Sequence, residues 1–507
     1  MNGPPASGSR APRRLPIVIG LATVGELGQI DTSGLREFFD GEFRSLRRRY
    51  PHSPLLALTR SDGDVERVAR AAAKAAEIAT LEFGSFPSQG RDAAQIDGTT
   101  GPFGVLGQAC HVLITVERSG GVRHHALGDD GAVNLLPEFA AEVIQIRLDA
   151  SPDKPTYSLS KLEPQRNASG AGKSSRPSDQ AMQRTDKFNR DAANAEQTQS
   201  HDGSDTPLQA LFGAADGLAN TCQKKLGRAF HAVFWLAILT TGFYGAFSEF
   251  DKNTPHIDQY VLVPYLLMLV AAYAVYYVAR RSDIHNRYVE YRALAEGMRV
   301  QCHWAACGIR RNVADFYLDR HPTALHWIRL ALRSATLLTA ADSVAPAPGS
   351  DAIREVLRSW ISEQRSYFTS TLEKARHREK LARNAVRVIF VLGGFATLVS
   401  LLQSQLKPFV PYLKEFGFLS ILCPAVATAV IALVGKLGVL YQVQHYSRML
   451  DIYSQAERYL APGVPASAGA VAMALGQEAL RESGDWLLFR RDRGIEEPSS
   501  PFRRPSW

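Results

Sequence analysis

Cysteine is scarce in this chain, and its scarcity limits the classes of protein that the sequence allows. The five cysteines among 507 residues are scattered and odd in number, at positions 110, 222, 302, 307 and 423. They predict no disulfide framework. Cys302 and Cys307 are five residues apart, so on a helix they would point about 140° away from each other. We therefore expect packing, and not metal binding, from this pair.

Catalytic motifs are missing as well. Gly20, Gly25 and Gly28 do not form the dinucleotide-binding fingerprint. No Ser-His-Asp set and no pair of carboxylates has a spacing that predicts catalysis. The polar segment 123–131, RHHALGDDG, is flanked by glycine, which is typical of a solvated loop. The sequence therefore predicts no catalytic residue and no metal ligand, and it argues against an enzyme.

Negative charge is in deficit. Lys and Arg number 58 against 50 Asp and Glu, which gives a formal net charge of +8. A basic excess can indicate a nucleic-acid partner, but these basic residues cluster beside long hydrophobic runs. Membrane topology explains that distribution more simply. We expect a lipid bilayer as a partner, and no nucleic acid.

Long hydrophobic runs occur four times, all in the second half of the chain. They cover residues 229–247, 259–279, 385–402 and 416–434. Each is close to the roughly 20 residues that a helix needs to cross the hydrocarbon core of a bilayer. The runs form two pairs with charged flanks on one side only, which argues against buried helices of a soluble protein. They predict two transmembrane hairpins.

The basic residues around these runs predict the orientation of the hairpins. Lys and Arg precede the first and third runs and follow the second and fourth. Lys224, before the first run, and Arg280, after the second, are examples. The two connecting segments carry only Lys252, and Lys407 with Lys414. Because Lys and Arg concentrate in cytoplasmic segments, the connecting segment of each hairpin should lie on the outer side of the membrane. Both termini should then be cytoplasmic.

A pore is one use for such spans. The polar candidates for lining it are Thr240, Thr241, Tyr244, Thr397, Ser400, Gln403 and Thr428. Each of these side chains can equally bond to the backbone of its own helix. Both interpretations stay open.

Amphipathic helices should adjoin the spans on the cytoplasmic side. One apolar stripe at helical spacing lies in 288–298, and Arg292, Glu296 and Arg299 have ion-pairing spacing on the opposite face. No Gly or Pro interrupts residues 351–392, so one helix is expected to run from the cytoplasm through the third span, roughly 75 Å at 1.5 Å per residue. This helix carries an apolar stripe, which predicts contact with neighbouring helices or with another subunit. The stripe consists of Ile353, Val356, Leu357, Trp360, Tyr367 and Phe368.

The segment 13–31, RRLPIVIGLATVGELGQID, admits two interpretations: a secretory signal or the first strand of a sheet. Its apolar run is only about 11 residues long and contains Pro16, and it lacks a clear small-x-small cleavage pattern. A cleaved signal would also place the basic flank of the first span on the wrong side of the membrane. We therefore favour the strand.

The amino-terminal region alternates strands and helices. Strands are predicted over 15–21, 53–59, 111–116 and 142–148, with a helix over 33–50 and another that starts at Ser61 and Asp64, spaced as a capping box. This alternation predicts an α/β Rossmann-like parallel sheet. Ligands of such sheets bind beyond the carboxyl ends of the strands, where turns can hold a phosphate. The candidate ligand residues are Gly20, Thr23, Gly25, Ser61, Asp62, Gly63 and Glu117.

These observations predict six regions. Residues 1–14 form a disordered tail, 15–150 the sheet domain, and 151–206 a disordered linker that is rich in Ser, Asp, Gln and Asn. The first hairpin with its cytoplasmic helices covers 207–345, the second covers 346–493, and 494–507 form a second tail. The chain should thus combine an α/β sheet domain with an all-α membrane domain.

The membrane half resembles the SLATT family, the SMODS and SLOG-associating two-transmembrane effectors. The resemblance is carried by the paired hairpins, by VEYRALAEGMRVQCHW after the second span and by LGQEALRESGDWLLFRRDR near the end. The amino-terminal domain resembles the SLOG group of Rossmann-like domains that sense or process nucleotides, through IVIGLATVGEL, RRRYPHSPLLALTRSDGDVERVARAAA and CHVLITVE. The chain departs from that group at 22–25 and 61–64, and it lacks the Gly-Gly-Gly-Thr-x-x-Glu pattern of the phosphoribohydrolases.

The resemblance implies a bacterial defence effector in the plasma membrane. In such a protein a cytoplasmic domain binds a nucleotide-derived ligand, a second messenger from a partner synthase, and controls pore formation by a homo-oligomer. Two alternatives remain. One is a membrane-anchored enzyme that processes nucleotides or nucleosides, and the other is a non-conducting scaffold with a decayed sensor domain.

Overall fold

The computed structural model describes thirteen stretches of the chain: 14–24, 32–59, 63–82, 110–118, 142–149, 156–162, 177–196, 206–249, 257–318, 325–340, 348–402, 415–461 and 467–491. Two compact units share these residues. The sheet unit comprises Met1–Leu218, Glu290–Val356 and Ala468–Arg481, and the hairpin unit comprises Ala219–Val289, Leu357–Ser467 and Glu482–Trp507. The predicted tails 1–14 and 494–507 lie almost wholly outside the described residues.

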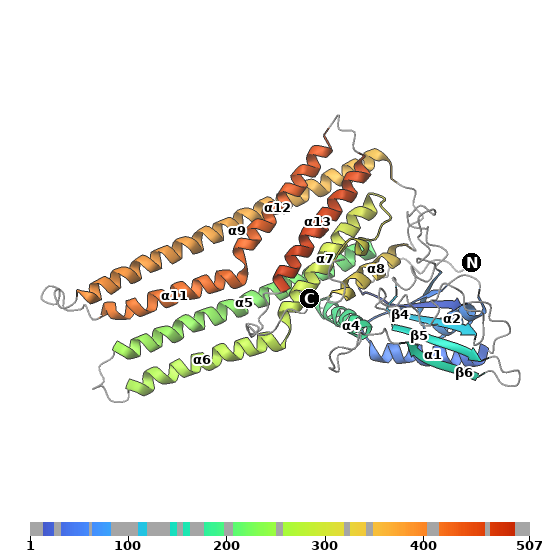
Figure 1. The fold of residues 1–507 in the computed structure, drawn as a ribbon, viewed down its shortest axis with the longest axis horizontal. Coiled ribbons are helices and arrows are strands. Elements are labelled where there is room, and N and C mark those ends of the chain that lie inside the picture. Colours follow the sequence, from blue (N-terminus) through green and yellow to red (C-terminus); the bar gives the residue numbers. More distant parts are fainter. Residues whose placement is uncertain are drawn as a thin grey trace. The chain divides into compact units, whose positions relative to one another are not determined.

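The sheet unit is built on six strands in the order β3-β2-β1-β4-β5-β6 (Figure 1). Their bounds are β1 (Ile17–Val24), β2 (Leu55–Thr59), β3 (Ala79–Glu82), β4 (Val112–Arg118), β5 (Glu142–Asp149) and β6 (Thr156–Leu162). The first five strands of that order are parallel, and β6 is antiparallel to β5. The predicted parallel sheet is confirmed, and its order is that of Rossmann-type sheets.

Apolar side chains on one face of the sheet form the core with two helices, α1 (Thr32–Arg49) and α2 (Asp64–Ala75). Phe39 and Phe43 of α1 are one helical turn apart, are fully buried and stack with ring centroids 6.0 Å apart. They belong to the same cluster as Ile17 and Ile19 of β1. Val18 lies between Ile17 and Ile19 in the strand, faces the opposite side of the sheet and is also fully buried. Burial of both faces is the usual condition of a parallel sheet.

The expected disordered linker 151–206 is wrong over two stretches, because β6 and helix α4 (Pro177–Glu196) lie within it. Asn189 of α4 is fully buried and holds the start of β1: its Oδ1 accepts from the Leu15 N–H and its Nδ2 donates to the Leu15 carbonyl, both at 2.8 Å. Nδ2 also donates to Ser53 Oγ at 2.9 Å. The polar composition that suggested disorder instead supplies buried hydrogen bonds.

Helix α7 (Ile284–Ala306) is buried on both of its faces. The predicted ion pairs are confirmed, with Glu296 contacting Arg292 at 2.8 Å and Arg299 at 2.7 Å. Asp216 of helix α5 (Pro207–Glu249) adds a contact of 2.7 Å to Arg292. The Arg292, Glu296 and Arg299 side chains are only 15–17% exposed, so this network lies inside the sheet unit. α4 also contacts α7, where Asp191 accepts from the Tyr291 hydroxyl at 2.7 Å.

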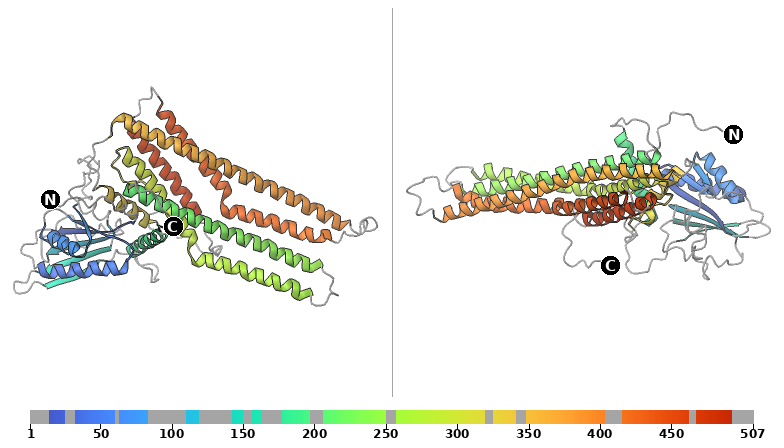
Figure 2. Two further views of the ribbon diagram at one scale, coloured as in Figure 1. Left: turned by 180° about the vertical axis from the view of Figure 1, so that it is seen from behind. Right: turned by 90° about the horizontal axis from the view of Figure 1, so that it is seen from above.

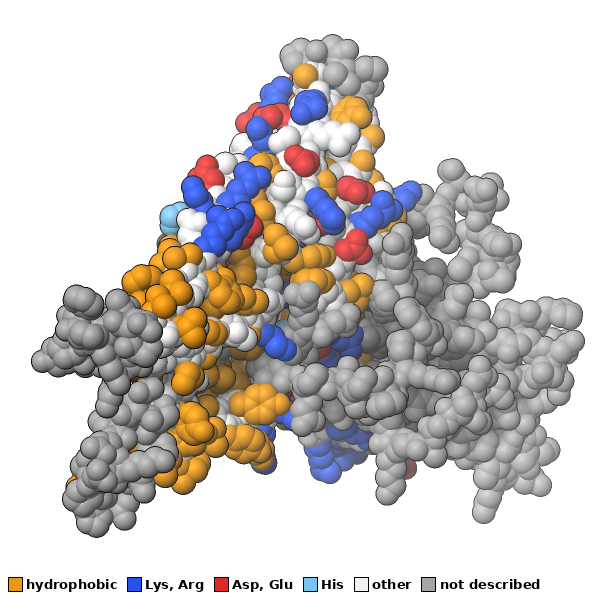
Figure 3. Space-filling view, turned by 60° about the vertical axis from the view of Figure 1, so that its left-hand side comes forward, with side chains coloured by type: hydrophobic (Ala, Val, Ile, Leu, Met, Phe, Trp, Pro, Cys, Tyr) orange, Lys and Arg blue, Asp and Glu red, His pale blue; other side chains and the backbone are white. Residues whose placement is uncertain are grey.

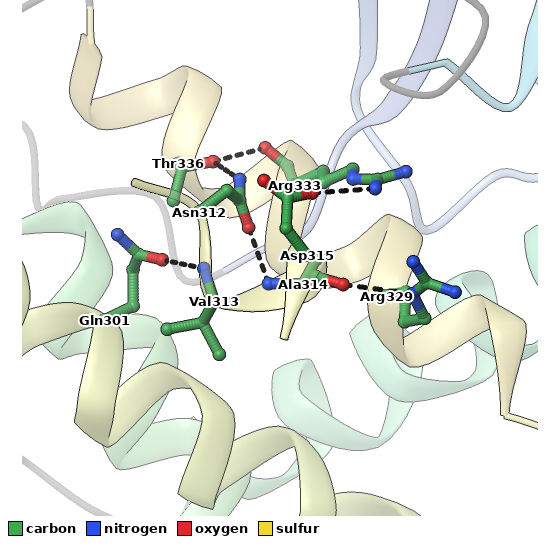
Figure 4. Close-up of polar contacts among 8 residues, drawn as sticks. All are labelled: Gln301, Asn312, Val313, Ala314, Asp315, Arg329, Arg333 and Thr336. Carbon is green, nitrogen blue, oxygen red and sulfur yellow. Dashed lines mark hydrogen bonds and ion pairs between the residues drawn. The ribbon is translucent and has the colours of Figure 1, made fainter. Parts of the chain in front are cut away.

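A polar network fixes the short helix η2 (Val313–Asp315) between α7 and α8 (His326–Ala340). Asn312 Oδ1 accepts from the Ala314 N–H at 2.9 Å, and its Nδ2 donates to Thr336 Oγ1 at 2.7 Å. The network joins η2 and its cap residue to Gln301 of α7, and to Arg329, Arg333 and Thr336 of α8. Figure 4 shows its members: Gln301, Asn312, Val313, Ala314, Asp315, Arg329, Arg333 and Thr336.

The hairpin unit contains the apolar parts of four helices that are long and apolar enough to cross a membrane: α5 (Pro207–Glu249), α6 (Ile257–Arg281), α9 (Ser350–Leu401) and α11 (Glu415–Leu437). Figures 1 and 2 show α5 beside α6, and α9 beside α11. Between 6% and 11% of the most apolar stretch of each is buried. The predicted spans are therefore confirmed as long apolar helices with exposed apolar surfaces, as in a membrane protein.

Helix α9 is continuous over 52 residues, which confirms the predicted uninterrupted helix. Its stripe packs on α12 (Val439–Tyr459): the ring centroids of Phe368 and Tyr453 lie 5.7 Å apart, and those of Trp360 and Tyr453 lie 6.2 Å apart. Tyr367, which the stripe included, is 42% exposed. The stripe is thus mainly an intramolecular contact.

We expect Asn189→Ala to destabilise the sheet unit, because the substitution leaves the buried N–H and carbonyl of Leu15 without their partners. An unsatisfied buried group costs about 1–3 kcal/mol, so the free energy of unfolding should fall by about 2–4 kcal/mol. Chemical denaturation of the full chain in detergent measures the change. Gln183→Ala, on the exposed side of α4, is the control and should stay within about 0.5 kcal/mol.

His111 predicts a pH dependence of stability. It is fully buried, its Nδ1 accepts from the Val18 N–H at 3.1 Å, and burial, with a smaller effect of His326, lowers its pKa from 6.5 to about 3. Because the folded pKa lies below the unfolded value, stability is fully present above pH 6.5 and is lost as pH falls toward 3.

Between pH 7 and pH 5 we expect this group alone to cost roughly 2 kcal/mol of unfolding free energy, at 1.36 kcal/mol per pH unit. His111→Asn keeps an acceptor for Val18 and should remove that part of the loss. The exposed His377→Asn should keep it. Equal pH profiles of unfolding for the wild type and His111→Asn would refute the assignment.

Candidate functional site

The carboxyl edge of the parallel sheet brings together the ends of β1, β2 and β4. Val24 at the end of β1 is in register with Glu117 of β4, and Thr59 ends β2. The amino terminus of α2 lies at the same edge, because α2 follows β2 after a short turn. Sheets with this strand order bind ligands at this edge.

The predicted ligand residues fall into three groups. Thr23 and Gly63 lie at the carboxyl edge, as does the backbone of Glu117. Gly20 does not, because it pairs with Leu58 and Leu113 in the interior of the sheet. Its assignment to the turn was wrong because β1 continues to Val24. The other three predicted residues, Gly25, Ser61 and Asp62, lie outside the described residues.

Glu66 is the central residue of this edge, and sequence analysis missed it. Its side chain is 3% exposed, and its Oε1 accepts from the Thr23 hydroxyl at 2.8 Å. Oε2 is buried and makes no hydrogen bond within the described part of the chain. Thr59 Oγ1, at the end of β2, is in the same condition. Unsatisfied buried polar atoms are unusual in folded proteins, and each calls for an explanation such as a bound water or a ligand.

The position of Glu66 follows from where α2 begins. The helix is capped by Gly63, and not by the predicted capping box, so Glu66 is its third residue. A Cβ at position 63 would overlap the Glu66 carboxylate, which therefore needs glycine there. A carboxylate near a helix amino terminus is stabilised by the helix dipole. An acid three residues after a glycine that follows a strand was the signal available in the sequence.

The chemistry of this edge is that of a hydrogen-bond acceptor. A phosphate at the start of α2 would meet the negative charge of Glu66, whereas a sugar hydroxyl or an amino group would donate to Oε2. The arrangement therefore suits a ligand with hydroxyl or amino donors near the start of α2.

A separate hollow lies along α1 and is lined by Gly41, Arg44, Ser45, Arg48 and Arg49. All of these residues come from a single helix. None of them was predicted to bind a ligand, and none lies at the carboxyl edge. The hollow is therefore not assigned to the candidate site.

Five of the predicted pore-lining residues, all Ser or Thr, bond to the backbone of their own helices, and Gln403 lies outside the described residues. Thr240 donates to Leu236 O at 2.6 Å, and Thr397 donates to Gly393 O at 2.8 Å. Thr241, Ser400 and Thr428 make the same kind of bond four residues back. These hydroxyls need no partner in a pore, so they give no evidence for a polar pore lining.

Each hairpin ends in one residue of left-handed conformation. Asp283, with φ 55°, separates α6 from α7, and Gly438, with φ 62°, separates α11 from α12. Asp is one of the residues that tolerates this region, and glycine has no side chain to clash. The two breaks occupy equivalent places after the second span of each hairpin.

The end of α13 (Ala468–Arg491) contacts both breaks within the hairpin unit. The Arg490 carbonyl accepts from His285 Nε2 at 2.9 Å, and the Phe489 and Tyr441 rings stack at 3.5 Å. Burial lowers the pKa of His285. The Trp486 ring contacts Tyr288 and His445. We call Trp486, Phe489 and Arg490 the C-terminal clamp, because they join the two hairpins.

Comparison with models of known families, with curated proteins and with solved structures gave no match.

Gly63→Ala should expel the Glu66 carboxylate from the edge. Because Gly63 has φ −90° and ψ 153°, alanine fits the backbone, and only the contact with Glu66 changes. Loss of the bond to Thr23 should cost about 1.5–3 kcal/mol, the range for hydrogen bonds to charged groups. Denaturant unfolding measures it.

The matched control is Gly41→Ala in α1, where a Cβ meets nothing within 4 Å. It should stabilise the chain by about 0.5–1 kcal/mol, because alanine favours a helix. A neutral or stabilising effect of Gly63→Ala would contradict the described position of Glu66.

Proposed function

We propose that this chain is a membrane effector in which a cytoplasmic ligand-binding sheet controls the permeability of a four-helix membrane unit. The observation that carries the proposal is Glu66: a buried carboxylate with a free oxygen, at the carboxyl edge of a parallel sheet, in a chain with four exposed apolar helices. In dinucleotide-binding sheets of this order an acidic residue accepts from a ribose hydroxyl, and we assign that role to Glu66 at the start of α2. A nucleotide-derived ligand therefore fits best.

Helix connectivity supports coupling between the two units. Four helices, α5, α7, α9 and α13, each contribute residues to both the sheet unit and the hairpin unit. A change in the sheet unit can thus be carried by continuous helices to the breaks at Asp283 and Gly438. The C-terminal clamp holds both breaks, and its release would let the hairpins move apart.

The wider setting is proposed from the resemblance to SLOG and SLATT proteins. In it the chain is a bacterial defence effector of the plasma membrane, with both termini cytoplasmic, that acts as a homo-oligomer. The ligand is a nucleotide second messenger made by a partner synthase. Ligand binding shifts the population toward a leaky arrangement, and the size of the shift is set by the difference in affinity between the two arrangements.

Leakage of a dye from liposomes that contain the full chain tests the proposal. We expect one member of a panel of cyclic and linear nucleotides to induce leakage. Glu66→Gln should abolish the leakage or raise the nucleotide concentration that it needs by at least tenfold, because it removes the charged acceptor. Glu37→Gln, an exposed acid on α1, should respond like the wild type.

The same preparation separates the alternatives. Nucleotide turnover in place of leakage would indicate the membrane-anchored enzyme. Nucleotide binding without leakage or turnover would indicate a scaffold. Leakage that is equal in the Glu66→Gln variant would contradict the sensor role of the carboxyl edge.

A further inference from the structure

Two arginines at the end of α6 are held by tyrosines of the same helix. Arg281 Nη1 donates to the Tyr277 hydroxyl at 3.0 Å, and Arg280 Nη1 donates to the Tyr276 hydroxyl at 3.5 Å. In both pairs the arginine lies four residues after the tyrosine. The guanidinium groups are therefore drawn back along the helix, toward its apolar part.

This pair of contacts lies at the edge of the candidate span. The membrane-length part of α6 is Tyr260–Arg281, so both arginines are its last residues. Tyr273 and Tyr277 are 67% and 47% exposed, and their rings stack at 6.3 Å. Tyrosines gather where the hydrocarbon of a bilayer meets the headgroups. Arginines bonded to them are held at the depth of the lipid phosphates.

Neither arginine forms an ion pair with a carboxylate in the parts of the chain that the structure describes. Arg292, Arg365 and Arg383, in contrast, each contact a glutamate. The acid closest in sequence is Asp283, whose Oδ1 accepts from Asn286 Nδ2 at 2.7 Å. Both guanidinium groups are exposed and keep most of their donors available.

The neighbouring helix of the hairpin carries cations at the same end. Lys224, Lys225 and Arg228 of α5 are exposed and form no ion pair within the described residues. Figure 2 shows α5 beside α6. Figure 3 shows Lys and Arg side chains next to the hydrophobic area of the molecule. The hairpin thus presents five positive charges at one end of its apolar surface.

We propose that the inner end of the α5–α6 hairpin is a binding site for the headgroups of anionic phospholipids. The phosphodiester accepts hydrogen bonds from Arg280 and Arg281, whose planar guanidinium groups suit two oxygens of one phosphate. Tyr276 and Tyr277 orient these groups at the interface. Lys224, Lys225 and Arg228 add an attraction that a zwitterionic headgroup cancels.

Lipid retention measured by native mass spectrometry tests the site. The full chain in detergent is given equal amounts of phosphatidylglycerol and phosphatidylcholine. We expect a preference for phosphatidylglycerol that falls roughly 25-fold in Arg280→Gln/Arg281→Gln, because each cation near the surface is worth about 1 kcal/mol and 1.4 kcal/mol is tenfold. Tyr276→Phe/Tyr277→Phe keeps both charges and should show a smaller fall.

Arg44→Gln/Arg48→Gln on α1 is the matched control, with the same loss of two exposed charges outside the spans. It should keep the wild-type preference. An unchanged preference in Arg280→Gln/Arg281→Gln, or an equal fall in the control, would overturn the proposal. So would displacement of the lipid by millimolar glycerol 3-phosphate, which would indicate a site for free phosphate instead.

Discussion

The hydrophobic surface of four long helices is the constraint on which the rest of the structure depends. Their most apolar stretches are at least 89% unburied within the chain, given the 6–11% that is buried. Exposure of so much apolar area to water is unfavourable, at roughly 25 cal/mol per Å². A bilayer removes the cost only if the helices satisfy their own polar groups. The hydroxyls of Thr240, Thr397 and Thr428 do so by bonding to their own backbones.

This constraint also decides where charged groups and irregular backbone can lie in the chain. Charges and special backbone conformations lie at the ends of the spans: the Tyr–Arg pairs of α6, the breaks at Asp283 and Gly438, and the C-terminal clamp. In the proposed function the ligand signal comes from the sheet unit. There Glu66 supplies the buried carboxylate oxygen that a ligand can satisfy. Continuous helices such as α5 and α9 join that unit to the spans.

The sequence predicted those parts of the fold in which one physical signal dominates. Four apolar runs and the uninterrupted α9 were predicted well because length and hydrophobicity alone decide them. The short strand β3 was missed because most of its residues are exposed and carry no apolar pattern. Helix α4 was taken for a linker, because the buried role of Asn189 depends on Leu15, 174 residues away.

The candidate site was predicted less completely, for a related reason. Strand polarity pointed to the carboxyl edge, and Thr23 and Gly63 lie there. Glu66 was missed because the start of α2 was placed at Ser61, two residues before its actual cap, which shifts the third helical position. The contact that makes Glu66 important joins it to Thr23, 43 residues earlier. Local spacing cannot reveal such a contact.

The membrane orientation of the chain tests the central claim most directly. Single cysteines at Glu37, on the exposed face of α1, and at Lys407, between α9 and α11, are introduced after the native cysteines are replaced by serine. A membrane-impermeant maleimide is then applied to intact cells. The account predicts labelling at position 407 in intact cells and at position 37 only after permeabilisation. Labelling at position 37 in intact cells would contradict it.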